Sequence, residues 1–479
     1  MKLTRSRGVL MHVSTLNGDF GCGSFGKEAR DFVDLLADCG YGYWQTLPFG
    51  VPDEGGSPYK SYSAFAGNPL FIDLPTLADE GLLTSDELEA ERAIYASDER
   101  IYNCDFAMLT ETRYALLRRV AERLRRENEP LARQICDFCL EHPYVDDYCR
   151  YMSRDRGDEE LFFHRFTQYE FLTQWWKLKR YANEHGVGII GDIPIYVDVD
   201  SADVSSYPQY FQLDSDARPV TVAGVPPDYF SPEGQMWGNP VYDWDALRRD
   251  GYKWWLDRLA WQLEIFDGIR IDHFRGFSAF YGIPADAKTA LEGRWYDGPG
   301  MDFIGRVAQL AQDKLIIAED LGVIDDDTRE LLRASGFPGM RVFQFAFTEE
   351  NSPHLPHNYV ENCVAYSGTH DNTTLLAYTL ELDEKTRSEM LSYIGFYGDG
   401  AASGDAVLRT ISRSAAALVI FPIQDILGYG CDTRMNVPGV ALGNWSYRVT
   451  KPQLDSIDRA YRRELGRVYG RLGGYTPGK

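Results

Sequence analysis

The sequence predicts an α/β protein built around a (β/α)8 barrel. The main observation is that short apolar runs alternate with helical stretches along the chain. Several runs are apolar on both faces, as expected of parallel strands covered by helices. Eight is the number of strands that closes this type of barrel. The candidate strands are Gly8–Val13, Tyr41–Leu47, Val187–Ile193, Phe266–Asp272, Lys314–Glu319, Met340–Phe345, Val364–Thr369 and Leu418–Ile423.

Helices predicted directly before two of these strands support the alternation. The helix predicted over Tyr252–Ile265 places Trp255 and Leu259 on one face and leads into the fourth strand. The helix predicted over Phe162–Glu184 stops just before Gly186, a typical signal for a helix C-terminus, and the third strand follows.

The strands are unevenly spaced, which predicts insertions within a single decorated barrel that spans residues 1–479. A long charged and helical stretch separates the second strand from the third, and we predict a helical insertion over residues 75–180. Residues 198–245 are rich in proline but too aromatic for a disordered linker. We predict that this loop-rich segment, between the third and fourth strands, forms an ordered cap over the barrel mouth.

Composition excludes several classes of partner. The 479-residue chain has a formal net charge of −23 at pH 7, whereas nucleic-acid binding needs a basic surface and anionic membranes repel negative charge. A neutral ligand fits this balance. The N-terminal residues do not resemble a signal peptide, and no apolar run approaches the ~18 residues of a membrane helix. The eight cysteines are spread thinly, as in a reduced protein, so we expect a cytoplasmic location. The composition does not decide between a monomer and a homo-oligomer.

Two short motifs have simpler explanations than a cofactor or a metal. Residues Gly21–Gly26 match the dinucleotide-binding pattern GxGxxG, but the acid expected about 20 residues later is missing. A glycine-rich turn that opens the first barrel helix explains them better. Cys136 and Cys139 form a lone CxxC motif, and no second pair completes a tetrahedral zinc site. We therefore expect neither an organic cofactor nor a metal ion.

Three acids stand where apolar runs end: Asp272, Glu319 and Asp371. A parallel barrel gathers the residues at the carboxyl ends of its strands on one rim. A single acid at such a position would more often belong to an ion pair. Three of them at matching strand ends, with Arg270 and His370 nearby, favour the cleavage of a glycosidic bond, for which paired carboxylates are suited.

The neighbours of these acids predict different protonation states. Arg270 and Asp272 point the same way along a strand, and a nearby guanidinium lowers the pKa of a carboxyl group, as a nucleophile requires. Glu319 follows an apolar run, and an apolar wall raises the pKa of a carboxyl group, as a proton donor requires. Asp371 and His370 can hydrogen-bond sugar hydroxyls, and a third carboxylate can hold the reacting ring in a distorted form.

Motifs along nearly the whole chain resemble those of the amylomaltases, the 4-α-glucanotransferases or disproportionating enzymes of the wider α-amylase superfamily. The blocks are WQTLP at 44–48, SPY at 57–59, SAFAGNP at 63–69, GDIPIYV at 191–197, PPDYFS at 226–231, GQMWGNP at 234–240, RIDHFRG at 270–276, AEDLG at 318–322, GTHDN at 368–372, RMNVPG at 434–439 and GNW at 443–445. Thr373, Phe49 and the segment 231–233 depart from the pattern of this family, which bears on chain-length preference rather than on chemistry.

The resemblance implies a role for each matching residue. Asp272 is expected to be the nucleophile, Glu319 the general acid and base, and Asp371 the stabiliser of the transition state. The resemblance also implies substrate-binding roles, with Gln235 and Trp237 on a flexible loop that curls over the glucan. The remaining expected substrate-binding residues are Tyr59, Asp192, Arg270 and His370.

The activity implied is the transfer of α-1,4-glucan segments to the 4-hydroxyl of glucose or a maltooligosaccharide, through a covalent glycosyl-enzyme and with retention. A retaining α-1,4-glucan hydrolase, similar to α-amylase, would use the same acids and is the main alternative. A non-catalytic glucan-binding barrel is a second alternative, although it would be expected to have lost at least one acid. A dinucleotide enzyme built on Gly21–Gly26 is a third.

Overall fold

The structure is a computed structural model that describes residues 3–52, 56–96, 101–227, 233–312, 314–440 and 442–476. Within these ranges, eight parallel strands close into a barrel in the order β1-β12-β11-β10-β9-β6-β3-β2. Each strand overlaps one candidate strand, so the predicted (β/α)8 barrel is confirmed. The barrel strands are β1 (Ser6–Leu10), β2 (Tyr43–Gln45), β3 (Gly188–Ile193), β6 (Gly268–Ile271), β9 (Leu315–Ala318), β10 (Gly339–Val342), β11 (Cys363–Tyr366) and β12 (Leu418–Pro422).

The first strand lies earlier in the chain than predicted. β1 ends at Leu10, and Val13–Thr15 form a short 3-10 helix instead of the end of a strand. β1 closes the ring because it pairs with both β12 and β2, and Gly8 stands opposite Tyr43 in the second pair. A Cβ atom at Gly8 would lie 3.0 Å from the Cβ atom of Tyr43, so this close approach favours glycine.

Alternation along the strands separates two apolar cores. Ile317 belongs to the cluster that fills the barrel, whereas its neighbour Ile316 packs in the larger cluster between the strands and the helices. Arg270 stands opposite Ile317 in the pairing of β6 with β9, and its Nε atom lies 3.5 Å from the sulfur atom of Met340 inside the barrel. A charged side chain is therefore held in the barrel interior, just below the rim.

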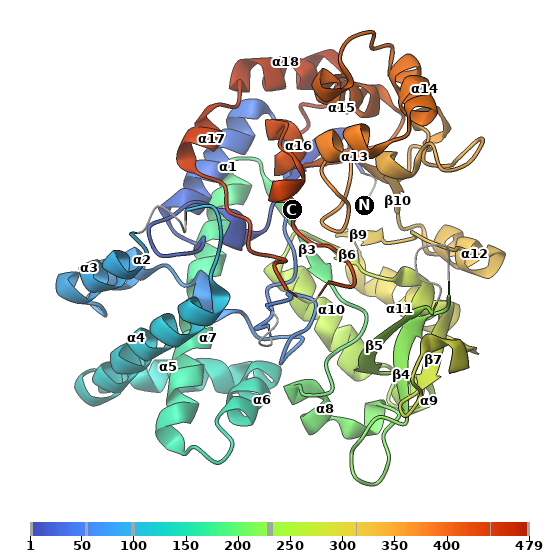
Figure 1. The fold of residues 1–479 in the computed structure, drawn as a ribbon. Coiled ribbons are helices and arrows are strands. Elements are labelled where there is room, and N and C mark those ends of the chain that lie inside the picture. Colours follow the sequence, from blue (N-terminus) through green and yellow to red (C-terminus); the bar gives the residue numbers. More distant parts are fainter. Residues whose placement is uncertain are drawn as a thin grey trace.

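A helical insertion separates β2 from β3, as predicted. In Figure 1 several of its helices project to the lower left of the barrel. The last of them, α7, has three acids in its first turn and ends at Glu184, next to Gly186 in the left-handed conformation, as the sequence predicts. The helices of the insertion are α2 (Leu74–Asp79), α3 (Ser85–Ile94), α4 (Phe106–Glu127), α5 (Glu129–Glu141), α6 (Pro143–Met152) and α7 (Asp158–Glu184).

The segment between β3 and β6 contains more regular structure than its sequence suggests. Two of its strands, β4 (Thr221–Val225) and β5 (Gln235–Pro240), join β7 (Ala279–Pro284) and β8 (Arg294–Asp297) in an antiparallel sheet of order β5-β4-β7-β8. This small sheet lies at the lower right in Figure 1, apart from the helical insertion. The segment between β3 and β6 also contains the helices α8 (Ala202–Ser206), α9 (Trp244–Arg249) and α10 (Lys253–Ile265).

Helices follow or precede the remaining barrel strands and complete the outer layer. None of the helices in the described ranges combines the length and the apolar composition that crossing a membrane requires. The remaining helices are α1 (Lys27–Cys39), α11 (Gly300–Ala311), α12 (Asp326–Ser335), α13 (Leu375–Glu381), α14 (Glu384–Ile394), α15 (Gly404–Arg413), α16 (Ile423–Leu427), α17 (Lys451–Asp455) and α18 (Arg459–Val468).

The glycine-rich motif forms the turn that opens α1, as predicted. Gly26 is the N-cap residue of this helix, and Gly21 has a φ of +81°. A Cβ atom at Gly23 would lie 1.9 Å from the carbonyl oxygen of Val13. The glycines are therefore required by a tight turn against the chain that leaves β1.

Candidate active site

The carboxyl ends of four barrel strands bring the predicted polar residues to one rim. Asp192 lies within β3, and Asp272 and Glu319 directly follow β6 and β9. His370 and Asp371 lie in the loop between β11 and α13. These strands are parallel, β3, β6 and β9 are adjacent and only β10 separates β9 from β11, so their carboxyl ends meet at the same end of the barrel.

A cleft of about 360 Å³ opens at this rim. Most of the predicted catalytic and substrate-binding side chains line it. The predicted residues Asp192, Arg270 and Glu319 are buried next to this cleft and interact with its lining, as the contacts below show. The lining residues are Ser57, Tyr59, Lys60, Pro194, Ile195, Tyr196, Gln235, Trp237, Asn239, Asp272, His370, Asp371, Asn436, Pro438, Gly439 and Trp445.

Arg270 connects two carboxylates. Its side chain is only 5% exposed, and its Nη1 atom donates to both carboxylate oxygens of Asp192 at 2.9 and 2.8 Å. Its Nη2 atom lies 2.8 Å from Oδ1 of Asp272, whose side chain is 31% exposed. The ion pair holds the Asp272 carboxylate in place at the edge of the cleft, where it can reach a bound sugar.

Glu319 is bound by backbone N–H groups, whereas Asp272 pairs with an arginine side chain. Glu319 is buried, and its two carboxylate oxygens accept hydrogen bonds from the backbone N–H groups of His273 and Leu321, both at 2.7 Å. His273 has a φ of +50°, which turns the chain after β6 toward this carboxylate. Burial, together with the negative charge of Asp272, raises the pKa of Glu319 to about 7, although Arg270 and the two N–H groups act in the opposite direction.

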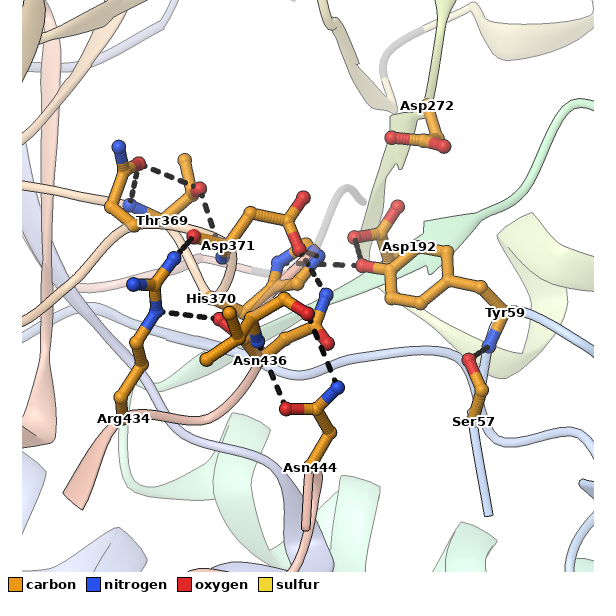
Figure 2. A network of polar contacts seen from close by, with 12 residues as sticks. Ser57, Tyr59, Asp192, Asp272, Thr369, His370, Asp371, Arg434, Asn436 and Asn444 are labelled. Atoms are coloured by element: carbon orange, nitrogen blue, oxygen red, sulfur yellow. Dashed lines mark hydrogen bonds and ion pairs between the residues drawn. The ribbon is translucent and has the colours of Figure 1, made fainter. Parts of the chain in front are cut away.

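Tyr59 and His370 connect Asp192 with Asp371. The Tyr59 hydroxyl donates to Asp192 at 2.7 Å, and the ring of Tyr59 stacks on that of His370 at 4.9 Å. Nε2 of His370 lies 3.4 Å from Oδ1 of Asp371. Figure 2 shows Asp192 and Tyr59 side by side, with His370 and Asp371 next to them and Asp272 farther along the rim.

Two further residues hold Asp371 and were not assigned a role from the sequence. The Asn436 side-chain amide donates to Oδ1 of Asp371 at 2.6 Å, and Arg434 donates to its backbone carbonyl oxygen at 2.5 Å. Both lie in the block at 434–439 that carries part of the family resemblance, which was the available signal. Figure 2 shows that both reach Asp371 from the segment before Asn444.

Gln235 and Trp237 line the cleft from β5, which corrects the expectation that they lie in a flexible loop. Gln235 is paired with Val225 across the antiparallel sheet, and this pairing satisfies the backbone. The Trp237 ring meets the His273 ring at 5.1 Å in an edge-to-face arrangement. Part of the segment 226–240, residues 228–232, falls outside the described residues.

Within the described residues, no group of three or more His, Cys, Asp or Glu side chains is arranged to hold a metal ion. All eight cysteines are free thiols, including Cys136 and Cys139 on α5. The expectation of chemistry without a cofactor or metal remains a prediction.

A (β/α)8 barrel that carries an ion-paired acid and a buried acid on the same rim is typical of enzymes that cleave glycosidic bonds. A family model described as 4-alpha-glucanotransferase matches residues 11–160 and 152–454. The chain therefore belongs to the 4-alpha-glucanotransferase family. The 4-alpha-glucanotransferase of Streptococcus pneumoniae serotype 4 is 40% identical, with 98% of each chain covered. That of Thermus thermophilus is 37% identical over 98% of this chain and 100% of the relative.

Solved structures agree with this assignment. The amylomaltase from Streptococcus agalactiae in complex with acarbose has a TM-score of 0.92 and 36% sequence identity, and 98% of this chain and 99% of that chain are covered. The amylomaltase from Corynebacterium glutamicum shares the fold at a TM-score of 0.79 and 18% identity, with 98% of this chain and 75% of that chain covered. The family resemblance predicted from the motifs is thus confirmed.

Proposed function

We propose that this protein transfers α-1,4-glucan segments from a donor to the 4-hydroxyl of an acceptor glucose or maltooligosaccharide, by a retaining double displacement. Membership of the 4-alpha-glucanotransferase family supports the reaction class. One structural observation supports the mechanism: Asp272 pairs with an arginine, whereas Glu319 on the adjacent strand end is buried with a pKa of about 7. A pKa near 7 suits Glu319 as the proton donor, and the ion pair with Arg270 holds Asp272 in place as the nucleophile.

In the first step, Glu319 gives its proton to the glycosidic oxygen while a carboxylate oxygen of Asp272 attacks the anomeric carbon. The bond between that carbon and the glycosidic oxygen breaks, and the shortened sugar leaves with a free 4-hydroxyl. The donor segment stays attached to Asp272 as an ester of inverted configuration.

In the second step, the ionised Glu319 takes the proton from the 4-hydroxyl of the acceptor, whose oxygen attacks the anomeric carbon. The ester bond to Asp272 breaks, and the second inversion restores the original configuration. Arg270 helps the departing carboxylate, because its guanidinium group remains paired with both Asp192 and Asp272.

Asp371, His370 and Tyr59 are proposed to hold the reacting sugar. Asp371 has 46% of its side chain exposed in the cleft, and its orientation is set by Asn436 and by His370. A carboxylate and an imidazole nitrogen in this position can bind two sugar hydroxyls and favour a distorted ring in the transition state.

Transfer competes with hydrolysis, because water can attack the same intermediate. An acceptor wins when it is held in place and water is excluded. We propose that the segment 198–245 performs this task as a cap, since Gln235, Trp237 and Asn239 from β5 line one side of the cleft. The relatives' names favour transfer over the hydrolase alternative.

A digest of maltotriose tests the proposal directly. A transferase yields glucose together with maltooligosaccharides longer than maltotriose, and chromatography resolves both. A hydrolase yields only shorter sugars. If the products are only shorter than the substrate, the transfer proposal is wrong while the roles of the acids survive. If no product forms with a folded protein, both are wrong.

A further inference from the structure

A buried carboxylate outside the cleft fastens the loop that carries His370 and Asp371. Asp425 lies in the short helix α16, directly after β12, and is 5% exposed. Its Oδ2 atom accepts a hydrogen bond from the hydroxyl of Ser367 at 2.6 Å, and its Oδ1 atom accepts one from the backbone N–H of Leu375 at 2.7 Å. Ser367 directly follows β11 and Leu375 begins α13, so one side chain joins both ends of the loop.

The residue next to Asp425 anchors the other segment that surrounds Asp371. The Gln424 side-chain amide donates to the carbonyl oxygen of Thr433 at 3.0 Å. Thr433 directly precedes Arg434, which holds the backbone of Asp371. The first turn of α16 therefore fixes both parts of the chain that set the position of the third acid.

A small cavity next to this loop leaves space into which the loop can move. The cavity has a volume of about 30 Å³ and is lined by His12, Thr15, His370, Thr373 and Asp425 among others. The hydroxyl groups of Thr15 and Thr373 are buried and have no hydrogen-bond partner among the described residues. Without the two hydrogen bonds to Asp425, the loop could relax toward these groups.

We propose that Asp425 is a positioning residue: by joining Ser367 to Leu375, it holds His370 and Asp371 at the reacting sugar. This inference rests on the proposed transferase function. The two loop residues are expected to bind the distorted ring more strongly than the relaxed one. A displaced loop should therefore lower kcat more than it raises KM.

Asp425→Ala removes both hydrogen bonds. We expect kcat for maltotriose disproportionation to fall about 10- to 100-fold, as for a catalytic group displaced by about 1 Å, while KM changes by less than about threefold. Asp425→Asn keeps the bridge, because its side-chain oxygen accepts from Leu375 and its amide donates to Ser367. Its kcat should therefore stay within about threefold of the wild-type value.

Asp73 offers a matched control far from the acids along the chain. It is 4% exposed and likewise accepts a serine hydroxyl, that of Ser24 at 2.7 Å, and a backbone N–H, that of Thr76 at 2.9 Å, and it accepts the Thr76 hydroxyl as well at 2.7 Å. It lies at the start of α2 in the helical insertion. Asp73→Ala should lower the thermal midpoint as Asp425→Ala does, but leave kcat unchanged.

The outcomes separate this inference from the function on which it rests. Wild-type protein that forms no longer oligosaccharides contradicts the proposed function. If the wild type is active, a kcat of Asp425→Ala equal to that of Asp73→Ala overturns the positioning role, and so does an Asp425→Asn variant as impaired as Asp425→Ala. If Asp425→Ala does not fold, Ser367→Ala replaces it: we expect a loss in kcat of about fivefold from one missing hydrogen bond, and an unchanged kcat overturns the inference.

Discussion

The carboxyl ends of β6 and β9 are neighbours in the barrel, yet they place their acids in opposite surroundings. Asp272, after β6, faces the Arg270 guanidinium and is partly exposed in the cleft. Glu319, after β9, is buried and accepts hydrogen bonds from two backbone N–H groups. Both residues are carboxylic acids, so the proposed division of roles between nucleophile and proton donor rests on their surroundings rather than on their chemical type.

The largest expected effect comes from removing the charge at the end of β6. Asp272→Asn leaves no nucleophile, and we expect kcat to fall by about 10⁴-fold or more. The substitution keeps the shape of the side chain, and Arg270 keeps its pairing with Asp192, so the thermal midpoint should change little. Chromatography of maltotriose products over several days measures the loss. Residual activity above about one percent of the wild-type value would show that another group attacks the anomeric carbon.

Replacing Glu319, the proposed proton donor after β9, should lower activity less than Asp272→Asn does, and the loss should depend on the leaving group of the substrate. Glu319→Gln cannot protonate the glycosidic oxygen, and we expect about a 10³-fold loss with maltotriose. A donor with an activated aryl leaving group does not need this proton, so formation of its glycosyl-enzyme should be restored in large part. A burst of released aryl alcohol in a stopped-flow experiment measures this. An equal loss with both donors would contradict the role of Glu319 as the acid.

Replacing Arg270 tests the ion pairs that surround Asp272. Lysine has one ammonium group and cannot pair with Asp192 and Asp272 in the way that the planar guanidinium group does. We expect Arg270→Lys to lower kcat about 10²-fold. Arg341→Lys is a matched control, since Arg341 also lies in a barrel strand, β10, and pairs with a carboxylate, but its partner at 3.1 Å is Asp320 rather than Asp272. Similar losses in both variants would mean that Arg270 serves folding only.

The comparison also predicts a pH dependence, which is the smallest effect. Burial raises the pKa of Glu319 to about 7, so its acid form is present below this pH and is lost above it. kcat/KM for maltotriose should therefore fall above pH 7, by about tenfold per pH unit, as the first step loses its proton donor. With the activated aryl donor, the rate of the first step should not show this decline. A pH profile that is flat from 6 to 9 with maltotriose would contradict the assignment.

The proposed catalytic residues could be predicted as a group because they follow local patterns in the sequence. An apolar run followed by a carboxylate marks the end of a buried strand, and the carboxyl ends of parallel strands meet at one rim. Asp272, Glu319 and Asp371 were therefore predictable as a group. The alternation of side chains also predicted that Arg270 and Asp272 lie together, and their ion pair confirms it.

The antiparallel sheet and the contact between Asn436 and Asp371 could not be predicted from local sequence patterns. The antiparallel sheet pairs β4, which precedes β6, with β7, which follows it, and prolines and glycines obscure the alternation in its strands. No strand was predicted there, and the resemblance placed Gln235 in a loop. Asn436 contacts Asp371 across 65 positions of the chain, and its sequence neighbourhood does not reveal this partner.

Short apolar runs that end in a carboxylate, a local pattern that marks a buried parallel strand, determine the barrel and the acids on its rim. The surroundings of each acid, and the raised pKa of Glu319, depend on groups brought together by packing. Glu319 receives a backbone N–H from His273, 46 positions away, and the loop of Asp371 is held by Asp425, 58 positions from Ser367. Such contacts arise only when distant segments are buried together, because desolvation and hydrogen bonding depend on what surrounds a group in space.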